Sequence, residues 1–356
     1  MHFMNSWYWK ALGVILILLS IIIGLLVPLK PGIIGIDRLS AKEGSDLNLK
    51  IETYNFNPTE VTTGFNAYLK VDSPLQIIKS SNVSFITKDL YSAEFFIPAI
   101  DFMDKEVVEA DVIITREQGG YAYLPGGLFI RNVQDLAIEN RGEELDNSIA
   151  VEELSGIYFP FRNILLETIK NTYYHIPLWF AMIIMFGLSA WYSSKYLRNK
   201  DITNDLRSQA FSEVGLLLGI LGLVTGAIWA KFTWGAFWSW DIKQFTSAVA
   251  LLIYLAYFIL RSSARDLTQR ARLTAAYNIF AFIMLIPLLF IIPRMTDSLH
   301  PGNGGNPAMG GEDLDNTMRM IFYPAIIGWI LFSNWISDIR FRILNLKYKF
   351  LLSVGS

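Results

Sequence analysis

The stretch GAIWAKFTWGAFWSWD, residues 226–241, holds four of the ten tryptophans of this chain. It lies between two apolar segments, near 210–230 and 244–261, and each of these is long enough to cross a bilayer as a helix. Indole rings present flat apolar faces, on which a planar aromatic ligand can stack. Tryptophan also gathers at membrane interfaces where nothing binds, and this second interpretation stays open.

The composition indicates an integral membrane protein. Hydrophobic residues make up 53% of the 356 residues and charged residues 17%, whereas soluble domains have about 45 to 50% and about 25%. The chain has no cysteine, which excludes disulfides and thiolate ligands. A bound metal would therefore need histidine, methionine or carboxylate ligands.

The apolar segments predict a six-helix membrane protein. The predicted spans lie near 9–29, 173–192, 210–230, 244–261, 274–293 and 320–338. The first is longer than the apolar core of a signal peptide, and no small-residue cleavage site follows it. We therefore expect residues 1–29 to be an uncleaved transmembrane anchor.

Basic residues predict the orientation of these spans. The segments 193–208, 261–272 and 336–349 carry four Lys or Arg each, and the short loops on the opposite face carry two each. Positive charge is retained on the cytoplasmic side. Both termini are then cytoplasmic, and residues 30–165, the Trp-rich loop 229–241 and two histidines lie outside.

Residues 30–165 read as an inserted extracytoplasmic all-β domain. Apolar and polar residues alternate over 47–52, 65–71 and 108–114, as in strands with one buried face. Six to eight short strands fit a small sandwich, with an Ig-like topology as one form, and a barrel fits the same pattern. The acidic stretch 139–153 reads as a solvated linker.

The aromatic loop offers a set of ligand-binding candidates. Trp234, Phe237, Trp238 and Trp240 form the stacking surface, Gly235 allows close backbone approach, and Asp241 can orient an indole or amide N–H.

Two of the three histidines, His175 and His300, end apolar segments on the outer face beside this loop. A pair of neutral imidazoles is a suitable axial ligand set for a haem that is only held or relayed, and acid should release such a ligand. The pattern predicts a non-covalent b-type haem site with His175 and His300 as metal ligands. The other interpretation is that each is an interfacial or capping residue. The third, His2, is expected to be incidental.

The propionates of haem require cationic partners. Lys231, Lys243 and Arg294 are the candidates from the short outer loops, although they can equally extend from helix ends to the interface. The glycine-rich loop 301–316 beside His300 is predicted either to move during ligand release or to be an unstructured connector.

Gly226 to Asp241, with Thr246 beyond, resembles the tryptophan-rich WWD haem-handling signature of the CcmC family of cytochrome c maturation proteins. The contexts 173–177 and 298–302 of the two histidines are similar as well. The resemblance implies haem transport in the bacterial inner membrane. Haem held between His175 and His300 would pass to a periplasmic CcmE-like chaperone, in a complex with CcmA-like and CcmB-like ABC transporter subunits.

Three features depart from the family pattern. Phe237 stands where tryptophan is frequent, the spacing from Asp241 to Thr246 is one residue longer, and residues 30–165 replace a short loop. The longer spacing puts the start of the fourth span in doubt, and the insertion is a candidate docking module. Residues 170–340 would form the five-helix haem-handling domain and 341–356 a basic cytoplasmic tail.

Two alternatives remain beside this reading. CcsA-type haem handling of system II shares a similar signature. From another class, a membrane receptor could bind an extracellular ligand through its β domain, although the sequence carries no recognisable output module. No nucleophile–base pair or phosphate-binding loop is present in the sequence, so we expect neither an enzyme nor a nucleic-acid partner.

Overall fold

The computed structural model describes residues 7–56, 64–72, 75–103, 105–116, 120–133, 157–163, 165–300 and 314–354. They divide into two compact units. One is Pro28–Leu166, and the other combines Met1–Val27 with Glu167–Ser356. The acidic linker 139–153, residues 301–313 of the glycine-rich loop and His2 lie outside the described residues.

Six helices of the described chain are long and apolar enough to cross a membrane, which confirms the predicted multi-pass fold. They are α1 (Tyr8–Leu26), α2 (Thr172–Asn199), α3 (Ile202–Trp234), α4 (Ile242–Ser263), α5 (Leu267–Ile286) and α6 (Asn316–Val354). The short turns η3 (Leu166–Asn171) before α2, and η4 (Pro287–Ile291) and η5 (Ile292–Arg294) after α5, extend two of them.

Several helices continue beyond their apolar segments. Helix α3 begins at Ile202, before the predicted 210, because Asp201 caps it by accepting the amide of Thr203. Helix α6 runs to Val354, through the segment predicted as a basic tail. Hydropathy reports the part of a helix that lies in lipid, whereas the helix itself ends where its hydrogen bonding ends.

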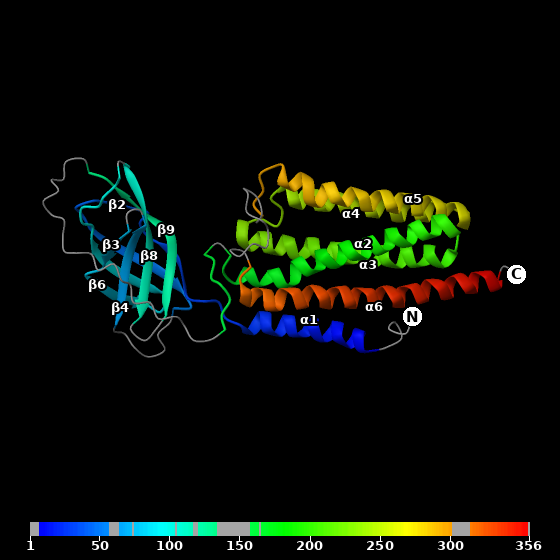
Figure 1. The fold of residues 1–356 in the computed structure, drawn as a ribbon, viewed down its shortest axis with the longest axis horizontal. Helices are drawn as coiled ribbons and strands as arrows, with labels where there is room; N and C mark the ends of the chain where they lie inside the picture. Colours follow the sequence, from blue (N-terminus) through cyan, green and yellow to red (C-terminus); the bar gives the residue numbers. More distant parts are fainter. Residues whose placement is uncertain are drawn as a thin grey trace. The chain divides into compact units, whose positions relative to one another are not determined.

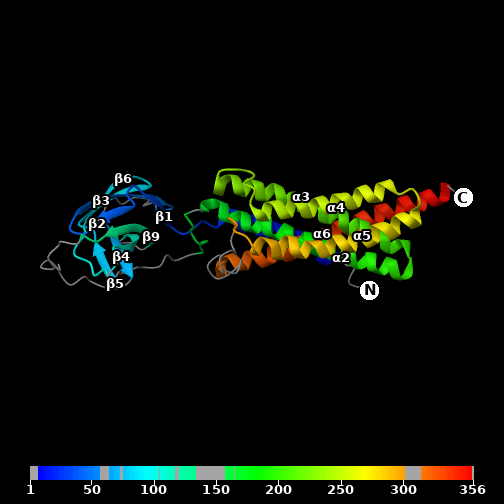
Figure 2. The same ribbon diagram turned by 90° about the horizontal axis from the view of Figure 1, so that it is seen from above.

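Within the bundle, α2 packs against α3, α5 and α6, while α1 lies along α6 and α4 lies along α5 (Figures 1 and 2). This arrangement brings the C-terminal end of α3, the start of α4 and the end of α5 to the same end of the bundle as the start of α2. Successive membrane helices run in opposite directions. The start of α2, the end of α3, the start of α4 and the end of α5 are therefore expected at one end of the bundle, where the structure has them.

The unit Pro28–Leu166 contains two β-sheets, as expected for a sandwich and not for a closed barrel. One sheet has the order β1-β3-β7-β6 and the other β2-β9-β8-β4-β5. The strands are β1 (Gly32–Ile36), β2 (Ser40–Lys42), β3 (Asp46–Tyr54), β4 (Phe65–Asp72), β5 (Leu75–Lys79), β6 (Asn82–Thr87), β7 (Leu90–Phe96), β8 (Val107–Arg116) and β9 (Tyr121–Arg131).

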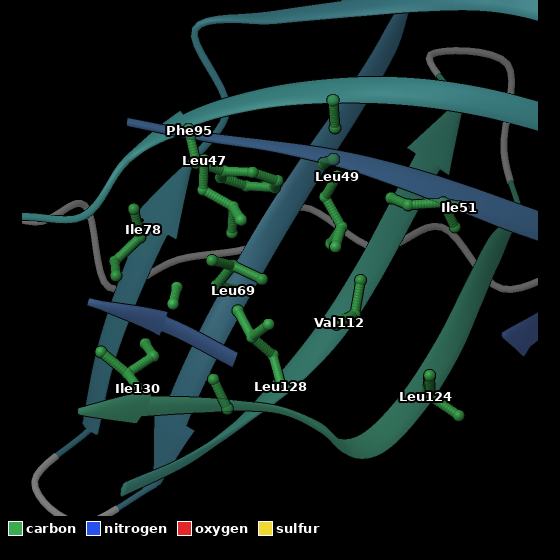
Figure 3. Packing of buried hydrophobic residues seen from close by; sticks show 14 of the residues in the cluster. Leu47, Leu49, Ile51, Leu69, Ile78, Phe95, Val112, Leu124, Leu128 and Ile130 are labelled. Carbon is green, nitrogen blue, oxygen red and sulfur yellow. The ribbon is translucent and has the colours of Figure 1, made fainter. Parts of the chain in front are cut away.

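The core of this unit follows the alternation read from the sequence. Leu47, Leu49 and Ile51 of β3 are buried between exposed neighbours, and they pack with Leu69 and Val112 of the other sheet (Figure 3). Strand β8, in the middle of its sheet between β4 and β9, departs from the pattern, since residues 110–115 are all buried and both of its faces are covered there.

Candidate functional site

A cavity lies where α2, α3, α4 and the end of α5 meet the segment that carries His300. It encloses about 920 Å³ of open space, part of which is continuous with solvent. Both candidate histidines line it, together with two other predicted residues, Trp238 and Lys243. The remaining walls come from Trp179, Phe180, Ile183, Gly222, Leu223, Gly226, Ala227, Gln244, Thr246, Ser247, Leu289, Phe290 and Pro293.

His175 lies near the start of α2, two residues before Pro177, which stands inside the helix and removes one backbone hydrogen-bond donor from it. The side chain is held directly against α3. A Cβ atom added to Gly226 would lie 2.7 Å from Cε1 of His175, and one added to Gly222 would lie 2.9 Å from Trp179. Glycine at these positions of α3 therefore provides the space for the imidazole and the neighbouring indole.

Thr225 selects the tautomer of His175. Its Oγ1 donates to a backbone carbonyl of the preceding turn, that of Leu221 at 2.9 Å or Gly222 at 3.1 Å. Since the hydroxyl has a single proton, it accepts from Nδ1 of His175, which lies 3.1 Å away. Protonated Nδ1 leaves the lone pair of Nε2 available for coordination.

Asp241 gives His300 the same tautomer. Nδ1 of His300 lies 2.8 Å from Oδ1 of Asp241, and a carboxylate can only accept, so Nδ1 carries the proton. Oδ2 of Asp241 accepts from the Ser298 hydroxyl and the Leu299 amide, both at 2.8 Å. A carboxylate behind an imidazole is the arrangement that orients metal-bound histidines and makes them more basic.

The same carboxylate organises the start of α4. Asp241 caps this helix by accepting the amide of Lys243 at 2.9 Å, so α4 begins at Ile242. Burial alone would raise the pKa of Asp241. The hydrogen bond and charge of His300, with the Leu299 amide and the Ser298 hydroxyl, outweigh burial and hold this pKa well below its usual range. The group is therefore an anion at neutral pH.

The donor set of the cavity, with two imidazoles, fits a haem. Among the described residues no three His, Cys, Asp or Glu gather to hold an ion. Two imidazoles on one cavity, each with Nδ1 beside a hydrogen-bonding side chain, offer two candidate ligand nitrogens. Mostly apolar and aromatic walls suit a planar macrocycle between them.

The four aromatic candidates have different positions. Only Trp238 lines the cavity, and its ring packs edge-on against Trp240 at 5.9 Å. Trp234 packs against His300, with ring centroids 4.8 Å apart. Trp240 and Phe237 are exposed, at 75% and 57%. The loop therefore forms one wall and one support for a ligand histidine, and not a single flat platform.

The backbone of the loop turns sharply at two positions. Gly235 ends α3 with a φ of 83°, a conformation that favours glycine, and Trp240 has a φ of 57°. A left-handed tryptophan costs about 1 to 2 kcal/mol. Gln244 supports this turn, because its Oε1 accepts from the Ser239 amide at 3.0 Å and the Ser239 hydroxyl at 3.2 Å.

Of the three basic candidates, only Lys243 lines the cavity. Lys231 is directed to the end of α3, where its Nζ donates to the Gly235 carbonyl at 2.9 Å and lies 5.8 Å from the Phe237 ring. Arg294, in η5, is absent from the cavity wall.

Sequence reasoning missed the residues that support the histidines, which include Thr225, Ser298, Trp179 and Gln244. One signal was available. Gly215, Gly219, Gly222 and Gly226 repeat at helical spacing along α3, as at close helix contacts in membranes. That repeat predicts a surface of α3 on which side chains of a neighbouring helix rest, although it does not name His175 as one of them.

Comparisons with known proteins identify the family of the helical unit. The family model for heme exporter protein C, CcmC, matches residues 160–350, which include all of α2 to α5 and most of α6. Heme exporter protein C of Paracoccus denitrificans is 24% identical over 164 residues, 46% of this chain and 68% of that protein. Its counterpart in Bradyrhizobium diazoefficiens is 27% identical over 171 residues, 47% of this chain and 61% of that protein.

A second kind of relative matches a shorter segment. The cytochrome c biogenesis protein CcsA of Prochlorococcus marinus subsp. pastoris is 41% identical over 71 residues, 20% of this chain and 23% of that protein. Helix α1 and residues 28–159 lie outside the family match. Because the match covers more than half of the chain and all the cavity-lining elements, this protein belongs to the heme exporter protein C (CcmC) family and carries an additional β domain after its first helix.

Proposed function

We propose that this chain holds haem at the cavity between His175 and His300 and hands it on for the maturation of c-type cytochromes. The observation that carries the proposal is the matched setting of the two imidazoles. Thr225 engages Nδ1 of one and Asp241 engages Nδ1 of the other, so both present Nε2 as a ligand. The names of the relatives, heme exporter protein C and cytochrome c biogenesis protein, support the same role.

His175 and His300 would hold the haem from its two sides, and Trp238, Trp179 and the apolar wall would exclude water from it. Bound haem would supply an iron that is saturated by two imidazoles, a state suited to carriage. Lys243 is the basic residue best placed for a propionate, because it lines the cavity. Lys231 and Arg294 remain weaker candidates. We therefore propose a carrier and not an enzyme.

We further propose an orientation and a set of partners. The bias of basic residues supports cytoplasmic termini in a bacterial inner membrane, with the haem cavity and the β domain in the periplasm. The acceptor would be a CcmE-like haem chaperone, and CcmA-like and CcmB-like ABC transporter subunits would complete the complex. The family match supports the existence of such a system.

Absorption spectroscopy of the detergent-purified full chain tests the haem site. We expect a bis-imidazole spectrum that is lost in His175→Ala and in His300→Ala. His2→Ala is the matched control, because it removes the third histidine of the chain and should leave the spectrum unchanged. A wild-type spectrum that survives in either site variant would reject the proposed ligand pair.

CcsA-type handling is the second candidate, favoured by the 41% identity over 71 residues. Both candidates use haem, so haem content does not separate them. A complementation experiment distinguishes the two candidates. A CcmC-type protein should restore c-type cytochromes in a strain that lacks its own CcmC and retains the other system I components. Rescue only in a strain lacking CcsA would select the second candidate.

A further inference from the structure

A second cavity lies at the opposite end of the same helices, between the start of α3, the end of α4, the start of α5 and the last part of α6. It encloses about 840 Å³ of open space, part of which is continuous with solvent. Its walls are Leu206, Gln209, Phe258, Arg261, Ser262, Leu267, Arg270, Leu344, Lys347, Tyr348 and Leu351. Four of these side chains are leucine, one is phenylalanine, three are cations and none is acidic.

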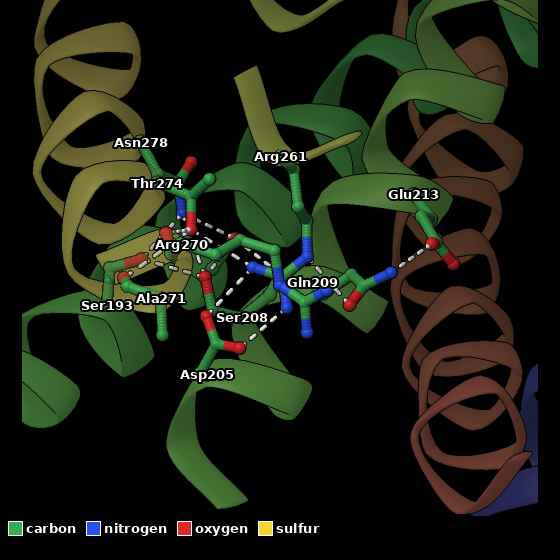
Figure 4. A network of polar contacts seen from close by, with 11 residues as sticks. Ser193, Asp205, Ser208, Gln209, Glu213, Arg261, Arg270, Ala271, Thr274 and Asn278 are labelled. Atoms are coloured by element: carbon green, nitrogen blue, oxygen red, sulfur yellow. Dashed lines mark hydrogen bonds and ion pairs between the residues drawn. The ribbon is translucent and has the colours of Figure 1, made fainter. Parts of the chain in front are cut away.

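The charges around this cavity are unbalanced. Two acids contact residues of the wall (Figure 4). Asp205 accepts two hydrogen bonds of 2.9 and 2.6 Å from Arg261. Glu213 accepts from Gln209 at 2.9 Å and is paired with Arg340, which does not line the cavity. Arg270 and Lys347 form no ion pair within the described residues. Asp266, at the cap of α5, accepts the amide of Gln269 and does not line the cavity. The wall therefore keeps two positive charges without a contacting acid.

The surrounding polar groups do not neutralise this excess. Arg261 also donates to Gln209 at 2.8 Å and to Thr274 at 3.0 Å, so the Asp205–Arg261 pair is satisfied within the bundle. Nε of Arg270 is different, because it is buried and has no hydrogen-bond partner among the described residues. A buried guanidinium nitrogen without an acceptor is unfavourable, and an anion in the cavity would satisfy it.

We propose that this cavity binds the headgroup of an anionic phospholipid. Arg270 and Lys347 would contact the phosphate, since a guanidinium and an ammonium are the side chains that recognise it. Leu206, Leu267 and Phe258 would pack against the upper part of an acyl chain. Basic pockets between transmembrane helices, near the interface that carries the basic loops, are known sites for such headgroups.

The three basic segments of the sequence support this location. Arg261 and Arg270 belong to one of them and Lys347 to another, and the start of α3 belongs to the third. These segments are far apart in the chain and converge on one cavity. The proposal is independent of haem binding, because no lining residue is shared with the cavity of His175 and His300.

Native mass spectrometry and thermal unfolding of the full chain in neutral detergent test the site, with cardiolipin, phosphatidylcholine and inorganic phosphate as probes. Cardiolipin should raise Tm and remain bound, and phosphatidylcholine and phosphate at the same concentration should do neither. Arg270→Gln and Lys347→Gln should each weaken the cardiolipin effect about fivefold. Lys347 is exposed, so its variant tests the site without affecting the fold.

Arg272→Gln and Lys349→Gln are the matched controls, because they remove the same charges from exposed positions of the same two helices. Equal losses in the control and cavity variants would overturn the site in favour of a general surface effect. Equal stabilisation by phosphatidylcholine or by inorganic phosphate would overturn the assignment to an anionic phospholipid.

Discussion

Asp241 holds His300 and the start of α4 through the same oxygen: Oδ1 lies 2.8 Å from Nδ1 of His300 and 2.9 Å from the amide of Lys243. Its second oxygen binds Ser298 and Leu299. One buried side chain thus fixes both the tautomer and the position of a proposed haem ligand. Asp241, the last residue of the Trp-rich loop, is therefore a positioning residue for His300.

Asp241→Asn should weaken haem binding about 10- to 100-fold, the usual effect of losing a partner behind a metal-bound histidine. An amide can donate as well as accept, so Nδ1 of His300 is no longer obliged to carry the proton. Titration of apoprotein with haem, followed by absorbance, measures the change. Asp297→Asn, at an exposed position nearby, is the control and should bind as the wild type does. Equal affinities of all three proteins would contradict the role given to Asp241.

Thr225→Val should also reduce haem affinity, by about tenfold, because His175 loses the acceptor for its Nδ1 proton. Valine has nearly the same shape but no hydroxyl. Thr225→Ser keeps the hydroxyl and is expected to keep the affinity. If valine and serine variants behaved alike, shape and not hydrogen bonding would be the cause.

Gly226→Ala should displace the His175 ring, since the added Cβ would meet Cε1 at 2.7 Å. We expect loss of the bis-imidazole spectrum and about tenfold weaker binding. Gly219→Ala is the control on the same helix, because its Cβ meets Leu251 and Met182 and not a histidine. A spectrum that fails equally in both variants would indicate a general effect on helix packing.

Acidification should release haem before the fold is lost. Coordination needs neutral imidazoles, so protons compete with the iron for these nitrogens as the pH falls. The pKa of Asp241 is lowered, so the stability that this carboxylate contributes is present above the usual carboxyl range and is lost only as the pH falls through the lowered value. Absorbance measures bound haem and circular dichroism measures helix content. Recorded over the same pH series, they show whether haem is released before the helices unfold. Simultaneous loss of haem and helix would refute this order.

Asp205→Asn should destabilise the bundle by about 3 to 5 kcal/mol, because it leaves the buried guanidinium of Arg261 without its counter-charge. Unfolding in a denaturing detergent, monitored by circular dichroism, measures the loss. Asp338→Asn is the control. Its partner Arg342 is largely exposed, and such a helix-surface pair contributes only about 0.3 to 0.5 kcal/mol. Similar destabilisation in both variants would contradict the importance of burial.

The sequence predicted the number of helices and the β character of the insertion, because hydropathy and alternation report directly on burial. It also named four residues of the cavity, among them Lys243 and Trp238. It could not separate Trp238 from Trp234, Trp240 and Phe237, since composition does not say which way a loop side chain is directed. Helix α4 was expected near 244, whereas the cap at Asp241 starts it at Ile242.

The residues that hold the histidines and Asp241 in place, such as Thr225 and Ser298, could not be predicted from the sequence for a different reason. Thr225 and His175 are 50 positions apart, and Ser298 and Asp241 are 57 apart. Such pairs depend on how helices pack and how a loop returns. Arg294 and Lys231 looked equivalent to Lys243 in the sequence, yet only the last reaches the cavity wall.

The two imidazoles are anchored with unequal rigidity. His175 belongs to a long helix, and its ring lies against α3 at Gly226 with Nδ1 beside Thr225. His300 belongs to a loop, and its ring is held by the contact of Nδ1 with Asp241 and by packing on Trp234. Of the two proposed haem ligands, one therefore sits on a rigid helix and the other on a loop. We expect haem that leaves the site to lose its bond to His300 first.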